Sequence, residues 1–136
     1  MTPRYRYILD EDGKPIPCGD LLRWARWMEG GHLRIAETTL SDGSWVSTVF
    51  LGIDHRIALL DGSGAAPILF ETMVFQVKGR PTDKDPFDME GIDQRRYCTR
   101  DQALAGHAEI VARWEGQLAE TAERLGQLAR EKASAD

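Results

Sequence analysis

Hydrophobic runs in the first half of the chain predict an antiparallel β-sheet. Leu33–Leu40 and Trp45–Ile53 are rich in β-branched and aromatic residues, and the polar segment 41–44 separates them, as in a hairpin. Apolar residues fall on both faces of the second run, which is typical of a central strand. Ile68–Val77 has the same character, and a shorter run, Tyr5–Leu9, precedes them. We expect these segments to form one sheet of roughly three to five strands.

A short helix is predicted between the first strand and the hairpin. Asp20 can cap its free amides, and Gly30 and Gly31 end it. Its apolar residues recur at helical spacing: Leu21, Trp24, Ala25 and Met28. A helix with one apolar face packs on a sheet, so the fold class expected is α+β.

The C-terminal residues 99–136 predict one long helix. Thr99 and Gln102 fit a capping box, and no proline follows them. A heptad pattern places a mainly apolar seam along the helix: Leu104, Val111, Leu118 and Leu125 at position a, and His107, Trp114, Thr121 and Leu128 at position d. Such a helix is longer than the ~30 Å diameter of a small domain. We therefore expect residues 1–98 to form the body, while the far end of the helix, from about Trp114, binds another chain, folds back at a glycine or frays.

The composition narrows the class of protein. The chain has 136 residues, with 22 acidic against 17 basic residues and a net charge of −5, which predicts one domain. Nucleic-acid binding is not expected, because affinity for phosphate comes from clustered Lys and Arg. The sequence has neither a membrane-spanning apolar run nor a signal peptide at its start, so we expect a cytoplasmic protein with no membrane partner. Cys18 and Cys98 are widely spaced and are expected to be core thiols rather than a disulfide.

Segment 81–94 is strongly acidic, with five acidic residues and one lysine. One interpretation is a solvated linker. The other is a negative surface for a basic partner, formed by Asp83, Asp85 and Asp88.

Four residues around the end of the second hairpin run form a possible ligand site: Asp54, His55, Arg56 and Glu71. Together with His32 or His107 they suggest a two-histidine, one-carboxylate metal site, but no metal-binding spacing supports it. We therefore predict no catalytic residues, no metal and no cofactor, with Asp54 fixing a loop and Glu71 paired. His107, at a seam position, is expected to be a packed core histidine rather than a ligand.

Three groups of residues carry a resemblance to a known family. These are Trp45 to His55, Pro67 to Phe75, and Tyr97 to Thr99 with Ala103 to His107. Over roughly residues 5–112 they resemble a family of small proteins encoded by tailed phages and prophages of high-GC bacteria. The chain departs from that family in a longer stretch after Val77 and in a final helix that extends beyond about Arg113. The resemblance implies an accessory function, such as inhibition of a bacterial defence system of the anti-CRISPR type.

The function expected from the sequence is therefore non-enzymatic protein–protein interaction with a host or defence protein in the host bacterial cytoplasm. The residues expected to bind the partner are Trp114, Leu118, Leu125 and Leu128 in the helix, and Asp83, Asp85 and Asp88 in the acidic segment. A homodimer through the heptad seam is a further expectation. Two alternatives stay open: a small-ligand-binding protein or metal-assisted enzyme, and a virion assembly component.

Overall fold

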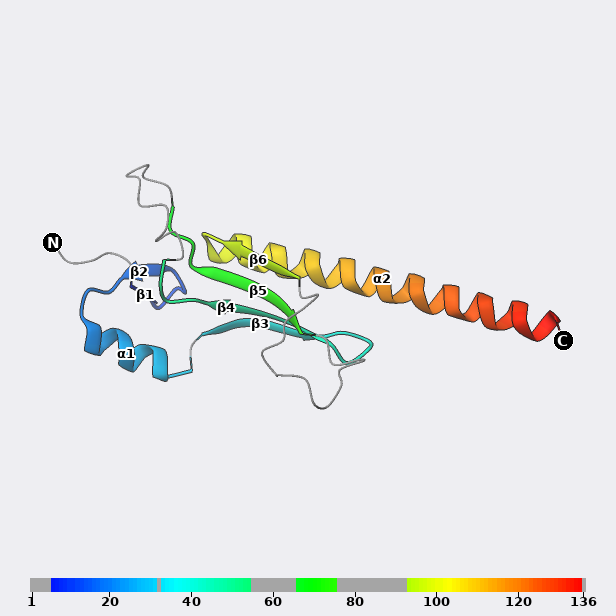
Figure 1. Cartoon of the computed structure of the whole chain (residues 1–136). Helices are drawn as coiled ribbons and strands as arrows, with labels where there is room; N and C mark the ends of the chain where they lie inside the picture. Colours follow the sequence, from blue (N-terminus) through cyan, green and yellow to red (C-terminus); the bar gives the residue numbers. More distant parts are fainter. Residues whose placement is uncertain (1–5, 32, 55–65, 76–92, 136) are drawn as a thin grey trace.

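A computed structural model describes residues 6–31, 33–54, 66–75 and 93–135, and it shows the α+β fold expected from the sequence (Figure 1). The described elements, in chain order, are β1 (Tyr7–Leu9), β2 (Pro15–Pro17), α1 (Leu21–Glu29), β3 (Arg34–Thr39), β4 (Trp45–Phe50), β5 (Phe70–Phe75), β6 (Gln94–Tyr97) and α2 (Arg100–Ala135). The expectations for His55, Arg56, Asp83, Asp85 and Asp88 lie outside the described residues.

The main sheet is an antiparallel meander in the order β3-β4-β5-β6. Strand β4 lies between β3 and β5, which confirms that it is central. The hairpin turn before it closes through the amide of Leu40, which donates to the carbonyl of Ser44 at 2.7 Å, and through Gly43 at a φ of 89°. Glycine adopts this positive φ without the steric cost that a side chain would bring.

The first strand does not join the main sheet, so the prediction for Tyr5–Leu9 is wrong in this respect. β1 pairs with β2 instead, because the chain reverses within a few residues. The Asp10 carboxylate accepts from the amides of Asp12 and Lys14, and Gly13 takes a φ of 78°. A single bridge between Arg6 and Ile53 connects this hairpin to the segment after β4.

Helix α1 begins and ends as predicted. Asp20 accepts from the amides of Leu22 and Arg23, and Gly30 is the C-cap. The helix packs through its tryptophans: Trp27 meets Phe50 edge to face at 5.6 Å, and the indole of Trp24 donates to the carbonyl of Gly52. Leu21 was expected on the packed face but is 55% exposed, because these contacts are made one to two turns further along the helix.

Helix α2 covers one face of the main sheet. The predicted capping box is confirmed, since the Thr99 hydroxyl accepts from the Gln102 amide and the Gln102 side chain accepts from the Thr99 amide. Among the described residues, the buried core has two clusters between helix and sheet: Leu40, Val46, Val74 and Ile110 in one, and Phe50, Leu69, Phe70 and Ala103 in the other. Both cysteines are free; Cys18 is buried as expected, whereas Cys98 is only half-buried.

The helix continues far beyond the sheet, as Figure 1 shows. Its 36 residues span about 54 Å at 1.5 Å per residue. Ile110 is its last buried residue and Leu118 the last that packs on the core. All residues from Ala119 to Ala135 are exposed except the half-buried Gly126. Within the described ranges, no helix combines the length and apolar character needed to cross a lipid bilayer.

Candidate functional site

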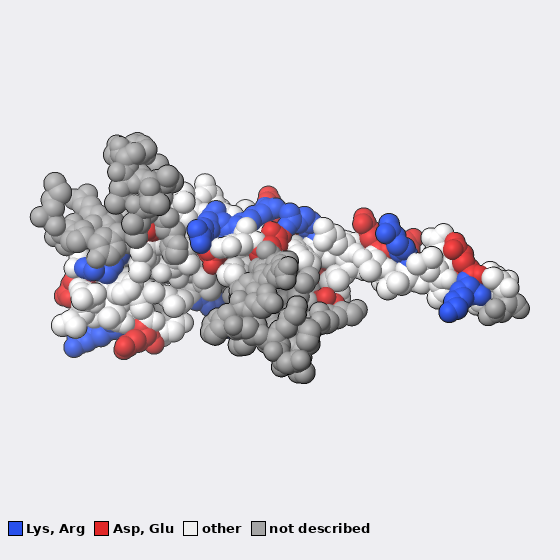
Figure 2. Space-filling view, viewed as in Figure 1, with Lys and Arg blue, Asp and Glu red and all other residues white. Residues whose placement is uncertain are grey.

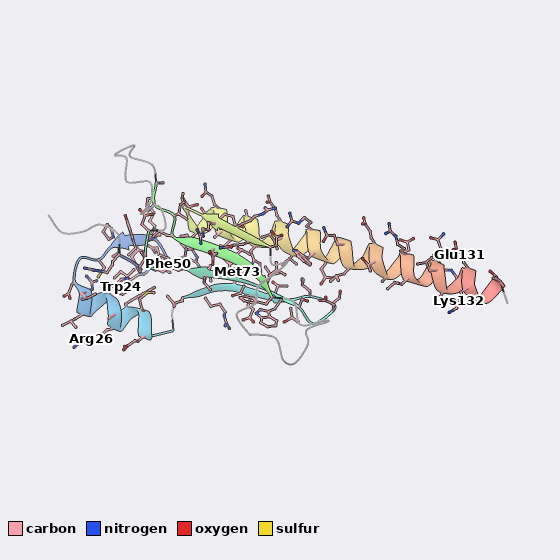
Figure 3. All side chains as sticks on the ribbon, in the orientation of Figure 1. Trp24, Arg26, Phe50, Met73, Glu131 and Lys132 are labelled. Carbon is pink, nitrogen blue, oxygen red and sulfur yellow. The ribbon has the colours of Figure 1, made fainter. Side chains whose placement is uncertain are left out.

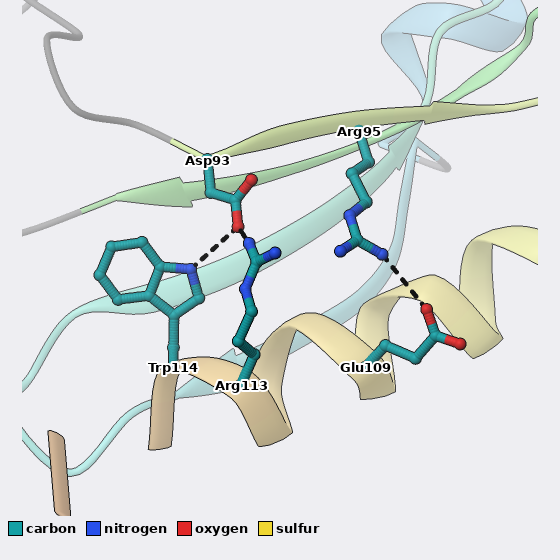
Figure 4. A network of polar contacts seen from close by, with 5 residues as sticks. All are labelled: Asp93, Arg95, Glu109, Arg113 and Trp114. Carbon is teal, nitrogen blue, oxygen red and sulfur yellow. Dashed lines mark hydrogen bonds and ion pairs between the residues drawn. The ribbon is translucent and has the colours of Figure 1, made fainter. Parts of the chain in front are cut away.

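Polar contacts between β6 and α2 hold the middle of the helix on the sheet (Figure 4). Asp93, just before β6, accepts from the indole of Trp114 at 3.1 Å and pairs with Arg113. One helical turn earlier, Arg95 pairs with Glu109 at 3.2 Å. These contacts fix the direction in which α2 leaves the body.

Trp114 is therefore not a free aromatic anchor. The sequence predicted that little would surround it, but its ring is half-buried and packs against the first core cluster. The reason is the length of the sheet, whose β3–β4 hairpin reaches further along α2 than expected. At that hairpin, the amide and hydroxyl of Ser41 donate to the two carboxylate oxygens of Glu115 at 2.7 and 2.9 Å.

The apolar face of α2 continues past these last contacts. Ile110, Trp114 and Leu118 follow one another at spacings of four residues on the face that meets the sheet. Beyond Leu118 the same face continues, at helical spacings of three, four and seven residues, through a group that we name the distal stripe: Ala122, Leu125, Leu128 and Ala129. Leu125 is 60% exposed and Leu128 is 54% exposed. One continuous face thus has a covered half and an uncovered half.

The uncovered half carries balanced charge. Its residues 119–135 hold three acidic side chains, Glu120, Glu123 and Glu131, and three basic ones, Arg124, Arg130 and Lys132. Figure 2 shows side chains of both signs on this end, with uncharged surface between them. Figure 3 shows Glu131 and Lys132 far from Trp24 and Phe50, at the opposite end of the molecule. The segment is net neutral although the whole chain has a net charge of −5.

The possible ligand site predicted from the sequence is only partly described. Asp54 is buried and accepts from the amide of Ile68 at 2.9 Å, so it joins the segment after β4 to the segment before β5. The Glu71 carboxylate accepts from Gln94 at 2.6 Å and from Arg96 at 2.8 Å. Each carboxylate therefore has a structural role, and no group of three or more His, Cys, Asp or Glu among the described residues could hold a metal ion.

His107 lies in a buried hydrogen-bonded cluster between α2 and the sheet. Its Nε2 lies 2.9 Å from the Thr38 hydroxyl and its Nδ1 lies 2.7 Å from the Thr48 hydroxyl, which also contacts Thr72 at 2.5 Å. Burial lowers the pKa of His107 below its ordinary value of 6.5. A neutral imidazole donates from one nitrogen and accepts at the other, which satisfies both contacts. The expectation of a packed core histidine is confirmed.

Most of this cluster was not predicted from the sequence. Its one signal is that Thr48 and Thr72 stand at inward positions of strands whose other inward residues are apolar, namely Val46, Phe50, Phe70 and Val74. A buried hydroxyl requires a hydrogen-bond partner, and His107 supplies it. Thr48, Thr72 and His107 come from three segments that are far apart in the sequence and meet here.

An open cleft of about 700 Å³ lies between the β1–β2 hairpin and the start of α2. Two polar groups along it have structural partners: Thr99 caps the helix, and the Cys98 thiol lies 3.7 Å from the carbonyl of Ala66. Four charged residues also line the cleft: Asp12, Lys14, Arg100 and Asp101.

Comparison with known proteins gives no assignment: no family model, curated protein or solved structure matches this chain.

Proposed function

We propose that this protein acts without catalysis, by binding another protein through the distal stripe of α2. The observation that carries the proposal is the continuity of one apolar face, covered by the sheet up to Leu118 and exposed at Leu125 and Leu128. A face of this kind on a helix is a common docking element for a groove or a second helix.

Energetics support a bound state for this segment. Residues 119–135 continue a helix that the packed part of α2 nucleates, but they gain no packing on the body, and a glycine such as Gly126 costs about 1 kcal/mol relative to alanine. Fully burying a leucine side chain contributes roughly 1.5–3 kcal/mol. Since Leu125 and Leu128 are a little more than half exposed, a partner that covers both would contribute about 2–3 kcal/mol.

The narrower role that we propose is inhibition of a defence system in the cytoplasm of a bacterial host. Its support is the family resemblance over residues 5–112, which suggests a phage accessory protein. The balanced charge of residues 119–135 suggests a partner surface that is apolar and without a strong charge of either sign.

Site-specific photo-crosslinking in the cells that encode the protein tests the binding role. A photoreactive phenylalanine derivative placed at Leu125 is expected to form covalent adducts with a protein. The matched control is the same group at Gln127, an exposed position on the opposite side of the helix. Adducts from Leu125 and not from Gln127 support the proposal, whereas equal yields, or none from Leu125, contradict it.

A further inference from the structure

We infer that the distal stripe binds a second copy of this chain, with the two α2 helices antiparallel. The inference rests on the proposed function, because it names the occupant of the same surface. Three features of the described residues carry it: the charge pattern beside the stripe, the length of helix that is uncovered, and the position of the sheet.

The charge pattern fits one antiparallel register. When Leu125 packs against Leu128 of the second copy, the symmetry of the pair also places Leu128 against Leu125 of the second copy. In the heptad frame, the residues that flank this core on one edge are Arg124 and Glu131. This register sets Arg124 opposite Glu131 of the second copy. The twofold symmetry repeats this contact, so the dimer has two such ion pairs.

The other edge of the same register is made of small residues. Ala122 and Ala129 flank the leucines there. Ala122 faces Ala129 of the second copy, and Ala129 faces Ala122 of the second copy. Small side chains let two helices approach closely, so the leucines can interdigitate. Glu123 and Arg130 lie on the outer side of both helices in this arrangement and take no part in it.

The length of the uncovered helix accommodates this register. The uncovered segment runs from Ala119 to Ala135, and its midpoint is residue 127. The leucine register places the twofold axis midway between residues 126 and 127, within one residue of that midpoint. Each Ala135 then lies beside Leu118 of the second copy, where the packed part of that helix ends.

The sheet excludes the parallel alternative. It packs on the same face of α2 that continues into the stripe, up to Leu118. Two parallel helices joined by this face would bring both sheets to the same end and against each other. A parallel pair would also set Lys132, at an a position of the heptad, against its own copy. The antiparallel pair places the two bodies at opposite ends.

The charge balance of the segment permits self-association. Three acidic and three basic side chains leave residues 119–135 neutral, so two copies meet there without net repulsion. The paired segment is only about 25 Å long, which is small beside a standard interface, so the dimer belongs to the weak class. We expect a monomer–dimer equilibrium with a Kd of roughly 10–300 μM.

Sedimentation equilibrium of the full chain at low salt tests the pairing through charge reversals. Arg124→Glu and Glu131→Arg change the net charge in opposite directions, yet each replaces two ion pairs with two like-charge contacts. Each is expected to raise the Kd about tenfold. The double variant, Arg124→Glu with Glu131→Arg, restores both pairs in reversed order and is expected to return the Kd to within about threefold of the original. Arg130→Glu and Glu123→Arg are the matched controls and should leave the Kd within about threefold.

A chain that stays monomeric up to about 1 mM overturns the inference, as does a double variant that is no tighter than either single variant. The photo-crosslinking experiment separates this failure from that of the proposed function. Adducts from Leu125 to a different protein, together with a monomeric chain, would keep the binding role and overturn self-pairing. If Leu125 forms no adducts and the chain also stays monomeric, both the binding role and self-pairing are overturned.

Discussion

Replacing Gly106 with alanine tests how closely α2 lies on the sheet. A Cβ at this position would overlap the ring and hydroxyl of Tyr97, closer than the 3.0 Å that real Cβ atoms keep. The ring cannot move away freely, because it packs against the cluster of Phe50, Leu69, Phe70 and Ala103. Its hydroxyl is buried without a hydrogen-bond partner among the described residues, which places the ring by packing alone.

The magnitude follows from two opposing effects. In an exposed helix, alanine is about 1 kcal/mol more favourable than glycine. Inserting a methyl group into a packed contact costs about 1–3 kcal/mol. Gly116, on the same helix, has nothing within 4 Å of the position that an alanine methyl group would take, so it provides the matched control. Gly116→Ala should therefore stabilise the protein by about 1 kcal/mol, and Gly106→Ala should be about 1–3 kcal/mol less stable than Gly116→Ala.

Urea unfolding followed by circular dichroism measures this difference. Dilute protein keeps the chain monomeric, and equal slopes against urea would show that only stability has changed. If the two alanine variants have the same free energy of unfolding, the close contact between Gly106 and Tyr97 is wrong.

The remaining predictions concern the core and its histidine. Ile110→Ala should lower the free energy of unfolding by about 2–5 kcal/mol, because Ile110 is fully buried, whereas Leu128→Ala in dilute protein should change it by less than about 0.5 kcal/mol. Equal effects in urea unfolding would refute this contrast. Because burial lowers the pKa of His107, the unfolded chain takes up its proton more readily than the folded chain. The stability that neutral His107 contributes is therefore complete above about pH 6.5 and is lost as the pH falls toward the folded pKa. Thermal unfolding should show that His107→Gln loses less stability than the original protein over this pH window. An equal loss in both proteins would contradict this prediction.

Local sequence signals predicted the elements whose ends are fixed by local chemistry. Asp20 and Thr99 accept from nearby amides at the starts of the two helices, and the turn before Trp45 closes through a glycine at positive φ. Signals of this kind depend on a few neighbouring residues, so the sequence shows them directly.

Elements that depend on distant partners were missed or displaced. β6 consists of Gln94, Arg95, Arg96 and Tyr97, a polar stretch with no strand pattern, and it forms because β5 offers it a backbone edge. The heptad frame placed Leu104 in the seam, but Leu104 is 39% exposed while Ala103 and Gly106 are buried. A straight helix on a sheet repeats every 3.6 residues, so its contact face drifts away from a 3.5-residue pattern.

The candidate site likewise has one part that the sequence predicts and one part that depends on tertiary contacts. The helix is too long for its body, so its sequence alone predicts an exposed end with Leu125 and Leu128. The residue at which the sheet stops covering α2 depends on the tertiary contacts of Asp93 with Arg113 and of Ser41 with Glu115. No local sequence pattern encodes these contacts. Because of those contacts, Trp114 packs on the body, whereas the distal stripe stays exposed.

Amide hydrogen exchange on dilute, monomeric protein tests most directly whether the body leaves the distal stripe uncovered. We predict strong protection for residues 103–114 and rapid exchange for residues 119–135, because only the first segment is packed on the sheet. Equal, strong protection of both segments would show that the chain covers its own stripe, and it would contradict a surface that needs another protein.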